Sequence, residues 1–200
     1  MAIRKVVIWP DPILSAVAQR VKQVDARVKT LVRDMFDTMY DANGVGLAAP
    51  QVGVSENIVV VDLNPRGRKK KKDMEELAEQ GFDGPRAFVN PEIIHREGTL
   101  IWEEGCLSIP GINEEVERSE IITVRALDVH GATFEKTVTG LYAVAIQHEL
   151  DHLKGKVFVD YVSRLKREMV KKKMTKIQKD TDDYYRDLRD EDEDEQAAAI

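Results

Sequence analysis

The sequence predicts an α+β fold, with small mixed or antiparallel sheets packed around a central helix and a further helix at the C-terminus. Two observations predict it. Short β-branched runs are separated by a few segments whose apolar residues recur at helical spacing, and strands and helices do not alternate regularly. With 200 residues, the chain is long enough to form one domain with a buried site.

The first helix is predicted from Asp25, a suitable N-cap, to about Ala42, because apolar residues recur every three or four positions between them. Residues 57–62 are then predicted to form a buried strand. Further strands are expected near residues 87–90 and 92–102. Together these segments supply the first half of the predicted sheet.

A hairpin is predicted from residues 121–128 and 132–139, turning at Val129-His130-Gly131. After Gly140 a helix should run to about Lys154 and end at Gly155. A last helix should begin near Ser163. These elements complete the α+β prediction.

The composition favours a soluble globular protein, since 42% of residues are hydrophobic and 33% are charged. No apolar run approaches the roughly 20 residues that span a bilayer, so no membrane association is expected. A single cysteine, Cys106, excludes an internal disulfide, and no segment resembles a signal peptide. A cytoplasmic location is therefore expected.

Charge is strongly segregated along the chain. Residues 66–72 are basic, and the stretch that follows them is acidic. Residues 164–179 carry eight Lys or Arg and one acid, whereas residues 180–195 carry ten acids and two arginines. We expect these blocks to be solvated appendages on a compact body. The formal net charge of −6 argues against general nucleic-acid binding, and no DNA partner is expected.

The sequence 147–152 contains the pattern His-Glu-x-x-His. At about 100° per residue, His148 and His152 project one turn apart from the same helix face as Leu141 and Val144, with Glu149 on its flank. Two convergent imidazoles beside a carboxylate that can move a proton suit a catalytic metal site. The alternative is a pair of core histidines with backbone hydrogen-bond partners. In that case the charge of Glu149, between them, would lie against the core without a function.

A third metal ligand must come from elsewhere, because no histidine follows His152. The usual metalloprotease extension is therefore missing. Cys106, in Glu104-Gly105-Cys106-Leu107-Ser108, can supply a thiolate and leave a fourth position open for water. Two alternatives remain open for this residue: a small buried hydrophobe and a cysteine nucleophile.

Residues 44–53 form a glycine-rich segment that superficially matches a dinucleotide-binding loop. Such a loop requires a preceding strand and a following helix, and the predicted order here is the reverse. A tight helix-to-strand connection is one interpretation. The functional interpretation is an exposed backbone edge for an extended peptide, with the Gln51 amide donating to a reacting oxygen.

In combination, three motifs resemble those of peptide deformylases, in the order found in that family. They are Gly44-x-Gly46-x-Ala48-Ala49-x-Gln51, then residues 104–108, then Gln147-His148-Glu149-x-Asp151-His152. The resemblance extends from Trp9 to about Leu165. It implies a metal-dependent hydrolase that removes the formyl group from N-terminal formyl-methionine on nascent polypeptides and releases formate.

The resemblance also implies roles for individual residues. Cys106, His148 and His152 hold the metal, which activates water, and Glu149 serves as general base and then acid. The Gln51 amide and the Leu107 backbone N–H stabilise the oxygen that gains charge. The remaining expected contacts are substrate backbone pairing at Gly46, a methionine pocket lined by Leu141 and Val144, orientation of a ligand histidine by Glu104, and an Arg118–Asp151 pair.

The expected cofactor is one divalent ion per chain, with Fe²⁺ as the native metal and Zn²⁺, Ni²⁺ or Co²⁺ able to occupy the same ligands. Residues 1–163 would form the catalytic deformylase domain, with 66–86 as a charged surface insertion. Residues 164–200 would form a basic helix and an acidic tail that we expect to be disordered.

The expected partners are an N-formylmethionyl peptide and, through residues 164–179, the ribosome. A monomer is expected. Two other functions remain open at this point: a zinc peptidase of another class, and a non-catalytic ribosome-binding module that a closed metal site holds together. The open fourth metal position and Gln51 favour catalysis.

Overall fold

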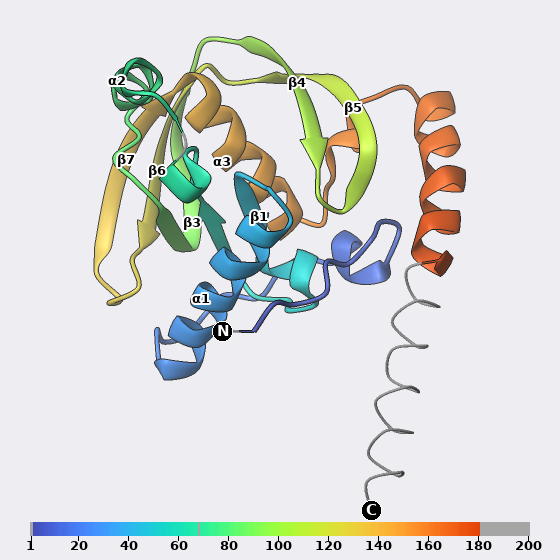
Figure 1. Cartoon of the computed structure of the whole chain (residues 1–200), viewed down its shortest axis with the longest axis horizontal. Helices are drawn as coiled ribbons and strands as arrows, with labels where there is room; N and C mark the ends of the chain where they lie inside the picture. Colours follow the sequence, from blue (N-terminus) through green and yellow to red (C-terminus); the bar gives the residue numbers. More distant parts are fainter. Residues whose placement is uncertain (1, 68, 181–200) are drawn as a thin grey trace, which may run out of the picture.

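The computed structural model describes residues 2–67 and 69–180, and confirms the α+β class. Its largest unit is an antiparallel five-stranded sheet in the order β1-β2-β3-β6-β7 (Figure 1). The strands of this sheet are β1 (Gly46–Ala48), β2 (Ile58–Val61), β3 (Arg86–Glu97), β6 (Ile121–Leu127) and β7 (Thr133–Thr139). A separate hairpin consists of β4 (Leu100–Cys106) and β5 (Ile109–Arg118).

The helix α3 (Gly140–Leu153) lies between this sheet and the β4–β5 hairpin (Figure 1). The helix α1 (Ala26–Asp41) begins as predicted, because the Asp25 carboxylate accepts a hydrogen bond of 2.9 Å from the Val28 N–H. The other helical segments are η1 (Pro12–Ser15), η2 (Ala49–Val52), η3 (Pro65–Gly67), α2 (Lys71–Glu79), η4 (Phe158–Asp160) and residues 164–180. Each helix of the described ranges is too short or too polar to cross a membrane.

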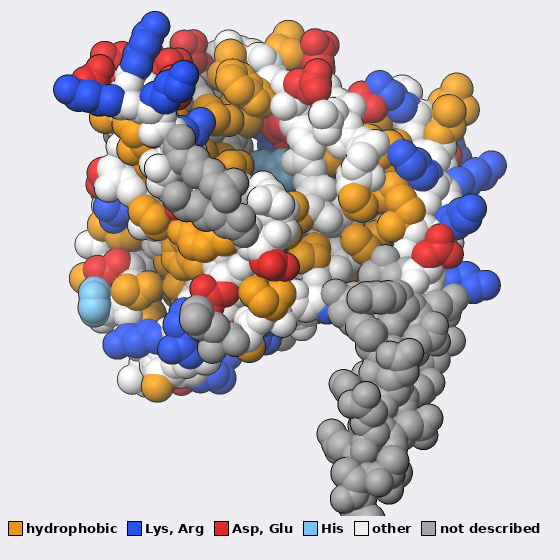
Figure 2. All heavy atoms as spheres, viewed as in Figure 1, with side chains coloured by type: hydrophobic (Ala, Val, Ile, Leu, Met, Phe, Trp, Pro, Cys, Tyr) orange, Lys and Arg blue, Asp and Glu red, His pale blue; other side chains and the backbone are white. Residues whose placement is uncertain are grey.

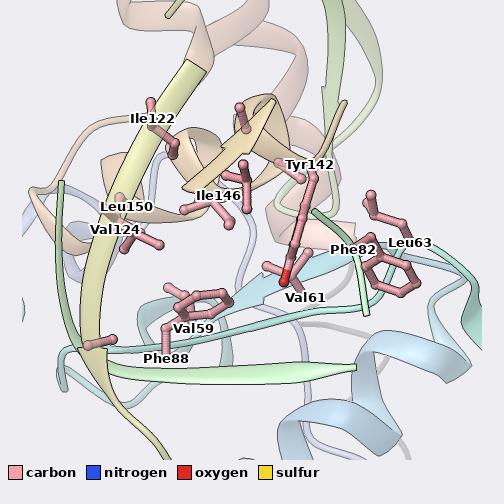
Figure 3. Close-up of a cluster of buried hydrophobic side chains, with 14 of the residues drawn as sticks. Val59, Val61, Leu63, Phe82, Phe88, Ile122, Val124, Tyr142, Ile146 and Leu150 are labelled. Atoms are coloured by element: carbon pink, nitrogen blue, oxygen red, sulfur yellow. The ribbon is translucent and has the colours of Figure 1, made fainter. Parts of the chain in front are cut away.

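Strand β2 explains why the sheet is covered on both faces. Its four residues are all buried, and they alternate between two core clusters. Val59 and Val61 pack toward α3, whereas Ile58 and Val60 pack toward α1. Figure 3 shows the first cluster, in which α3 contributes Ile146 and Leu150 and the sheet contributes Val59, Phe88 and Val124. Full burial of each such side chain contributes about 1.5–3 kcal/mol, so α3 is fixed firmly on the sheet.

A third cluster joins the β4–β5 hairpin to the C-terminal part of the chain. It contains Trp9, Ile109, Val116, Phe158 and Met174. The helix at 164–180 is therefore no solvated appendage: its Val170 and Met174 are buried in this cluster, and only its other sides are exposed. The acidic stretch 181–195, expected to be disordered, lies outside the described residues.

The prediction of separate strands at 87–90 and 92–102 was wrong. β3 continues through Asn90 and Pro91 because a bulge shifts the register between Val89 and Glu92, and Asn90 adopts a positive φ of 54°. The strand break lies instead at Gly98, where φ is 67°. The Asn90 side chain stabilises the bulge through two hydrogen bonds to the Val21 backbone.

Two strands, β1 and β5, were not predicted, and part of the charged stretch 66–86 forms the helix α2. β5 was not predicted because it contains three glutamates and few apolar residues, and pairing with β4 stabilises it. β1 is only three residues long and was taken as part of a loop. Within 66–86, α2 packs on the core through Leu77, and Phe82 follows it into the same cluster.

Candidate metal centre and catalytic cleft

Helix α3 holds both histidines of the predicted motif, and it is buried on every side rather than on one face. All its residues from Tyr142 to Leu153 are buried. The face expected to be the apolar one carries His148 and His152, but the face that packs on the sheet is roughly opposite and carries Ile146 and Leu150. Helix α3 thus supports the fold with one face and presents the histidines with the other.

Cys106 reaches the same point from the end of β4. A register shift between Gly105 and Cys106 interrupts the β4–β5 pairing there. Cys106 Sγ lies 3.3 Å from His152 Nε2, and one ligand atom from each of Cys106, His148 and His152 lies within 4.8 Å of the others. Bond lengths of about 2.0–2.3 Å separate neighbouring ligand atoms of a tetrahedral ion by about 3.5 Å. The three side chains therefore fit a metal ion and leave one position for another ligand.

A buried ion-pair chain orients His148. Its Nδ1 lies 2.8 Å from Glu104 Oε2, which leaves Nε2 for a metal. Arg118 donates to both oxygens of Glu104, at 2.6 and 2.9 Å, and to Asp151 Oδ2. The Tyr161 hydroxyl donates to the same Asp151 oxygen at 2.9 Å. The structure thus brings together Glu104, Arg118 and Asp151, which sequence analysis grouped around the histidines.

The charged groups in this row of buried ion pairs stabilise one another. Burial alone would raise the pKa of Glu104, but the hydrogen bonds from Arg118 and His148 outweigh it and lower this pKa to about 2. Burial, followed by the charges of His148 and Arg118, lowers the pKa of His152. Glu104 is therefore a carboxylate that can hold His148 Nδ1, and His152 is a neutral imidazole, the state that can ligate a metal.

Glu149 stands apart from this chain of ion pairs. Its side chain is 4% exposed and lines the cleft, and its Oε2 has no hydrogen-bond partner within the described residues. Burial is the main cause that raises the pKa of Glu149, to about 7. A carboxyl group of this pKa can both accept and return a proton near neutral pH.

The Gln51 side chain approaches the centre from η2. Its Oε1 accepts a hydrogen bond of 2.8 Å from the Ala48 N–H, and its Nε2 lies 3.4 Å from Cys106 Sγ and 3.2 Å from Ser108 Oγ. Because a backbone N–H can only donate, the Ala48 contact turns the amide nitrogen toward the metal ligands. Gln51 can therefore donate to an oxygen that binds at the centre.

A cavity of about 470 Å³ opens at the metal centre. Figure 2 shows a hollow near the middle of the view, with pale-blue histidine atoms at its base. Apolar atoms form most of its wall. The predicted residues that line it are Gly46, Gln51, Glu104, Cys106, Leu107, Leu141, Val144, His148 and Glu149.

His152 is fully buried beneath this wall, and Arg118 and Asp151 line a separate polar cavity of about 330 Å³ behind α3. Sequence analysis missed several neighbours of the centre. Ser108 stood within a quoted motif but received no role, whereas nothing in the sequence pointed to Trp102, Asn113 or Tyr161.

Comparison with known proteins gives one consistent result. A family model described as polypeptide deformylase matches residues 3–168. Peptide deformylases of Alkalilimnicola ehrlichii and Neisseria gonorrhoeae are 49% and 45% identical over 177 and 181 residues. These alignments cover 88% and 90% of this chain, and 92% and 99% of those proteins.

Solved structures give the same result. The peptide deformylase of Legionella pneumophila has a TM-score of 0.77 and 45% identity, with 89% of this chain and 96% of that chain covered. The enzyme of Ehrlichia chaffeensis in complex with actinonin has a TM-score of 0.78 and 37% identity, with 88% and 98% covered.

Proposed function

This chain belongs to the polypeptide deformylase family, and from that premise we propose which of its residues perform the reaction. The enzyme removes the N-formyl group from nascent polypeptides by hydrolysing the formyl-methionine amide. The observation that carries the assignment is the environment of Glu149. This buried carboxylate has one oxygen without a partner in the described residues, and it lines the same cleft as Cys106 and His148.

Cys106 Sγ and the Nε2 atoms of His148 and His152 are the proposed ligands of one divalent ion, with Fe²⁺ as the native metal. A thiolate and two imidazoles suit several first-row ions, so Zn²⁺, Ni²⁺ or Co²⁺ can take the same place. When bound, the metal acts as a Lewis acid that lowers the pKa of water and polarises the formyl oxygen. Metal analysis after anaerobic purification should give about one iron per chain, and a fully active enzyme that contains only zinc would contradict the iron assignment.

Glu149 is the proposed proton carrier. Its carboxylate takes a proton from the attacking water as the water oxygen bonds to the formyl carbon. The same carboxyl group then returns a proton to the amine nitrogen as the carbon–nitrogen bond breaks, so formate and a free N-terminus leave. The raised pKa of Glu149, about 7, favours both transfers near neutral pH.

Gln51 and Leu107 are the proposed donors to the formyl oxygen. As the formyl carbon becomes tetrahedral, this oxygen gains negative charge, and fixed N–H groups stabilise it. The Gln51 amide nitrogen is already close to Cys106 Sγ. The backbone N–H of Leu107, the residue after this ligand, would provide the second hydrogen bond.

Gly46 and the cleft wall are proposed to bind the peptide. β1 is an edge strand of the five-stranded sheet, so an extended substrate can add to its free edge at Gly46. Leu141 and Val144 lie one turn apart on α3 and line the cleft. They are the proposed wall of the pocket for the methionine side chain.

Formate release from a formyl-methionine peptide tests this assignment under anaerobic conditions. Glu149→Gln preserves the shape of the side chain but removes the proton carrier, so kcat should fall at least about 10²-fold with about one metal per chain retained. Exposed Glu97→Gln serves as the control. A Glu149→Gln enzyme with normal turnover would contradict the proton-carrier role.

The two other functions considered from the sequence predict different results in the same assay. A zinc peptidase of another class would cleave an internal peptide bond of the unformylated peptide. A non-catalytic metal-held module would bind metal and release no formate from either substrate. The match to the polypeptide deformylase family over residues 3–168 supports neither of these two functions.

Residues 164–179 are the proposed ribosome contact. Lys171, Lys172, Lys176 and Lys179 are exposed on the helix, whereas Lys166 pairs with Glu114 and Arg167 with Asp160. These exposed lysines can contact rRNA phosphates. The enzyme itself is proposed to be a monomer in the cytoplasm, where nascent polypeptides are available.

Ribosome cosedimentation at several salt concentrations tests this contact. Deletion of the helix would also remove the buried Val170 and Met174, so a charge variant is the better probe. Lys171→Gln/Lys172→Gln/Lys176→Gln should weaken cosedimentation and reduce its salt dependence, with unchanged deformylation of a short peptide. Equal cosedimentation of this variant and the wild type would refute the contact.

A further inference from the structure

Ser108 is fully buried beside the proposed active site, and the proposed reaction gives it no role. Its Oγ accepts a hydrogen bond of 3.2 Å from Gln51 Nε2. Its neighbour Leu107 lines the cleft, and Cys106 is a proposed metal ligand. Ser108 therefore contacts the catalytic amide through its side chain and lies two residues from a ligand.

The Gln51 side-chain amide can donate only two hydrogen bonds from its nitrogen and accept others at its oxygen. Its nitrogen carries two protons, and the contacts are with Ser108 Oγ and Cys106 Sγ. Its oxygen is occupied by the Ala48 N–H. With the oxygen held on one side and one N–H held by the serine, the second N–H is directed toward the metal ligands.

The backbones of Gln51 and Ser108 are held together independently of this contact. The extended N-terminal segment donates from the Val7 N–H to the Gln51 carbonyl at 2.8 Å, and from the Trp9 N–H to the Ser108 carbonyl at 2.9 Å. One short segment thus links two loops that are far apart in sequence. The separation of the two side chains is set before any substrate arrives.

We propose that Ser108 is a positioning residue, whose hydroxyl orients the Gln51 amide so that its second N–H, which lies toward Cys106 Sγ, can meet the formyl oxygen. This inference rests on the proposed role of Gln51. A donor that is already oriented stabilises the negative charge that develops on the formyl oxygen without first having to rotate. This avoided reorganisation is the source of its contribution to the rate. Ser108 does not itself touch the substrate in this account.

Loss of the hydroxyl should affect the chemical step more than substrate binding. In Ser108→Ala one amide N–H loses its acceptor in a buried environment, so the amide rotates away from its productive orientation. We expect kcat to fall about tenfold, KM to change less than about twofold, and metal content to stay near one per chain. Exposed Ser15→Ala is the matched control and should behave as wild type.

A double-mutant cycle separates positioning from general structural support. Gln51→Ala alone tests the proposed function and should lower kcat about 10²-fold. In that background Ser108→Ala should change kcat by less than about twofold, because no amide remains to be oriented. A merely structural role would lower kcat equally in both backgrounds, and this result would overturn the inference.

Ser108→Thr provides a second measurement, since it keeps the hydroxyl. We expect its kcat to lie within about threefold of wild type. A folded, metal-loaded Thr variant as slow as Ser108→Ala would also overturn the inference. Normal turnover of Gln51→Ala would instead refute the role proposed for Gln51, and so identifies which of the two proposals has failed.

Discussion

Two glycines allow the chain that leads into β1 to pass close to the side chains of Glu149 and Leu107, two residues of the proposed active site. A Cβ on Gly46 would lie 2.3 Å from Glu149 Oε1, and a Cβ on Gly44 would lie 2.8 Å from Leu107 Cδ1. Both glycines were seen in the sequence, but the atoms that require them come from segments about 60 and 100 residues away. The glycines are needed for close approach to these side chains.

Gly46→Ala should therefore lower kcat at least about tenfold, because the new methyl group displaces the Glu149 carboxylate. Gly44→Ala is the matched control, and its effect should be smaller because the contacted atom is the end of a flexible leucine. Steady-state kinetics with metal analysis checks both. Equal kcat for Gly46→Ala and wild type would show that Glu149 tolerates the displacement.

The link from Arg118 through Glu104 to His148 should be visible in metal affinity. Glu104→Gln keeps the shape but removes the charge that orients His148, so affinity should fall about 10- to 100-fold. The neighbouring Glu103→Gln, which alters an exposed carboxylate, is the control. Competition with a chelator measures both, and a Glu104→Gln enzyme with normal affinity and turnover would contradict the orienting role.

At the scale of the elements, the C-terminal helix supports the hairpin that carries Cys106. Its Met174 lies in the same cluster as Ile109 and Val116 of β5, and Lys166 pairs with Glu114 of that strand. Figure 1 shows this helix against the outer side of the hairpin. The helix therefore combines an exposed basic surface with a packing role.

Met174→Ala should reduce the free energy of unfolding by about 2–4 kcal/mol, because it leaves a cavity in this cluster. Met169→Ala removes the same atoms from the same helix at a position that is 64% exposed, so it should change stability little. Denaturant unfolding of the metal-loaded enzymes compares the two. Similar stability losses would show that the helix does not depend on the buried contact.

In the whole molecule, the three proposed metal ligands connect α3 with the separate β4–β5 hairpin. The sheet and its two helices have their own apolar clusters, whereas Cys106 and the histidines meet across the cleft between these parts. The fold should therefore survive metal removal, and its stability should increase when metal binds.

Chelator-treated enzyme should keep its far-UV circular dichroism and a cooperative thermal transition, but with a lower Tm. Added Zn²⁺ should raise the Tm in a concentration-dependent manner, by mass action on the folded state. Cys106→Ser should lose most of this response because a thiolate ligand is missing. A Tm that is independent of metal in the wild type would show that the three residues do not bind the ion tightly.

Local sequence patterns predicted the fold class and the residues proposed to carry the chemistry. Three of these patterns are local, so the geometry of a single helix or strand is enough to interpret them. They are the Asp25 cap, the apolar run in β2 and the four-residue spacing of His148 and His152. β5 and the bulge at Asn90 could not be predicted in this way, since their stability depends on pairing with other strands.

Which of these groups come into contact depends on the packing of segments that are remote in sequence. The sequence suggested that Cys106 joins the histidines, but the 3.3 Å approach to His152 depends on how β4 packs beside α3. The contacts of Ser108 with Gln51 and of Tyr161 with Asp151 have no sequence spacing that would indicate them. Local patterns specify helices, strands and side-chain chemistry, whereas distances between remote segments are set by the packing of the whole core.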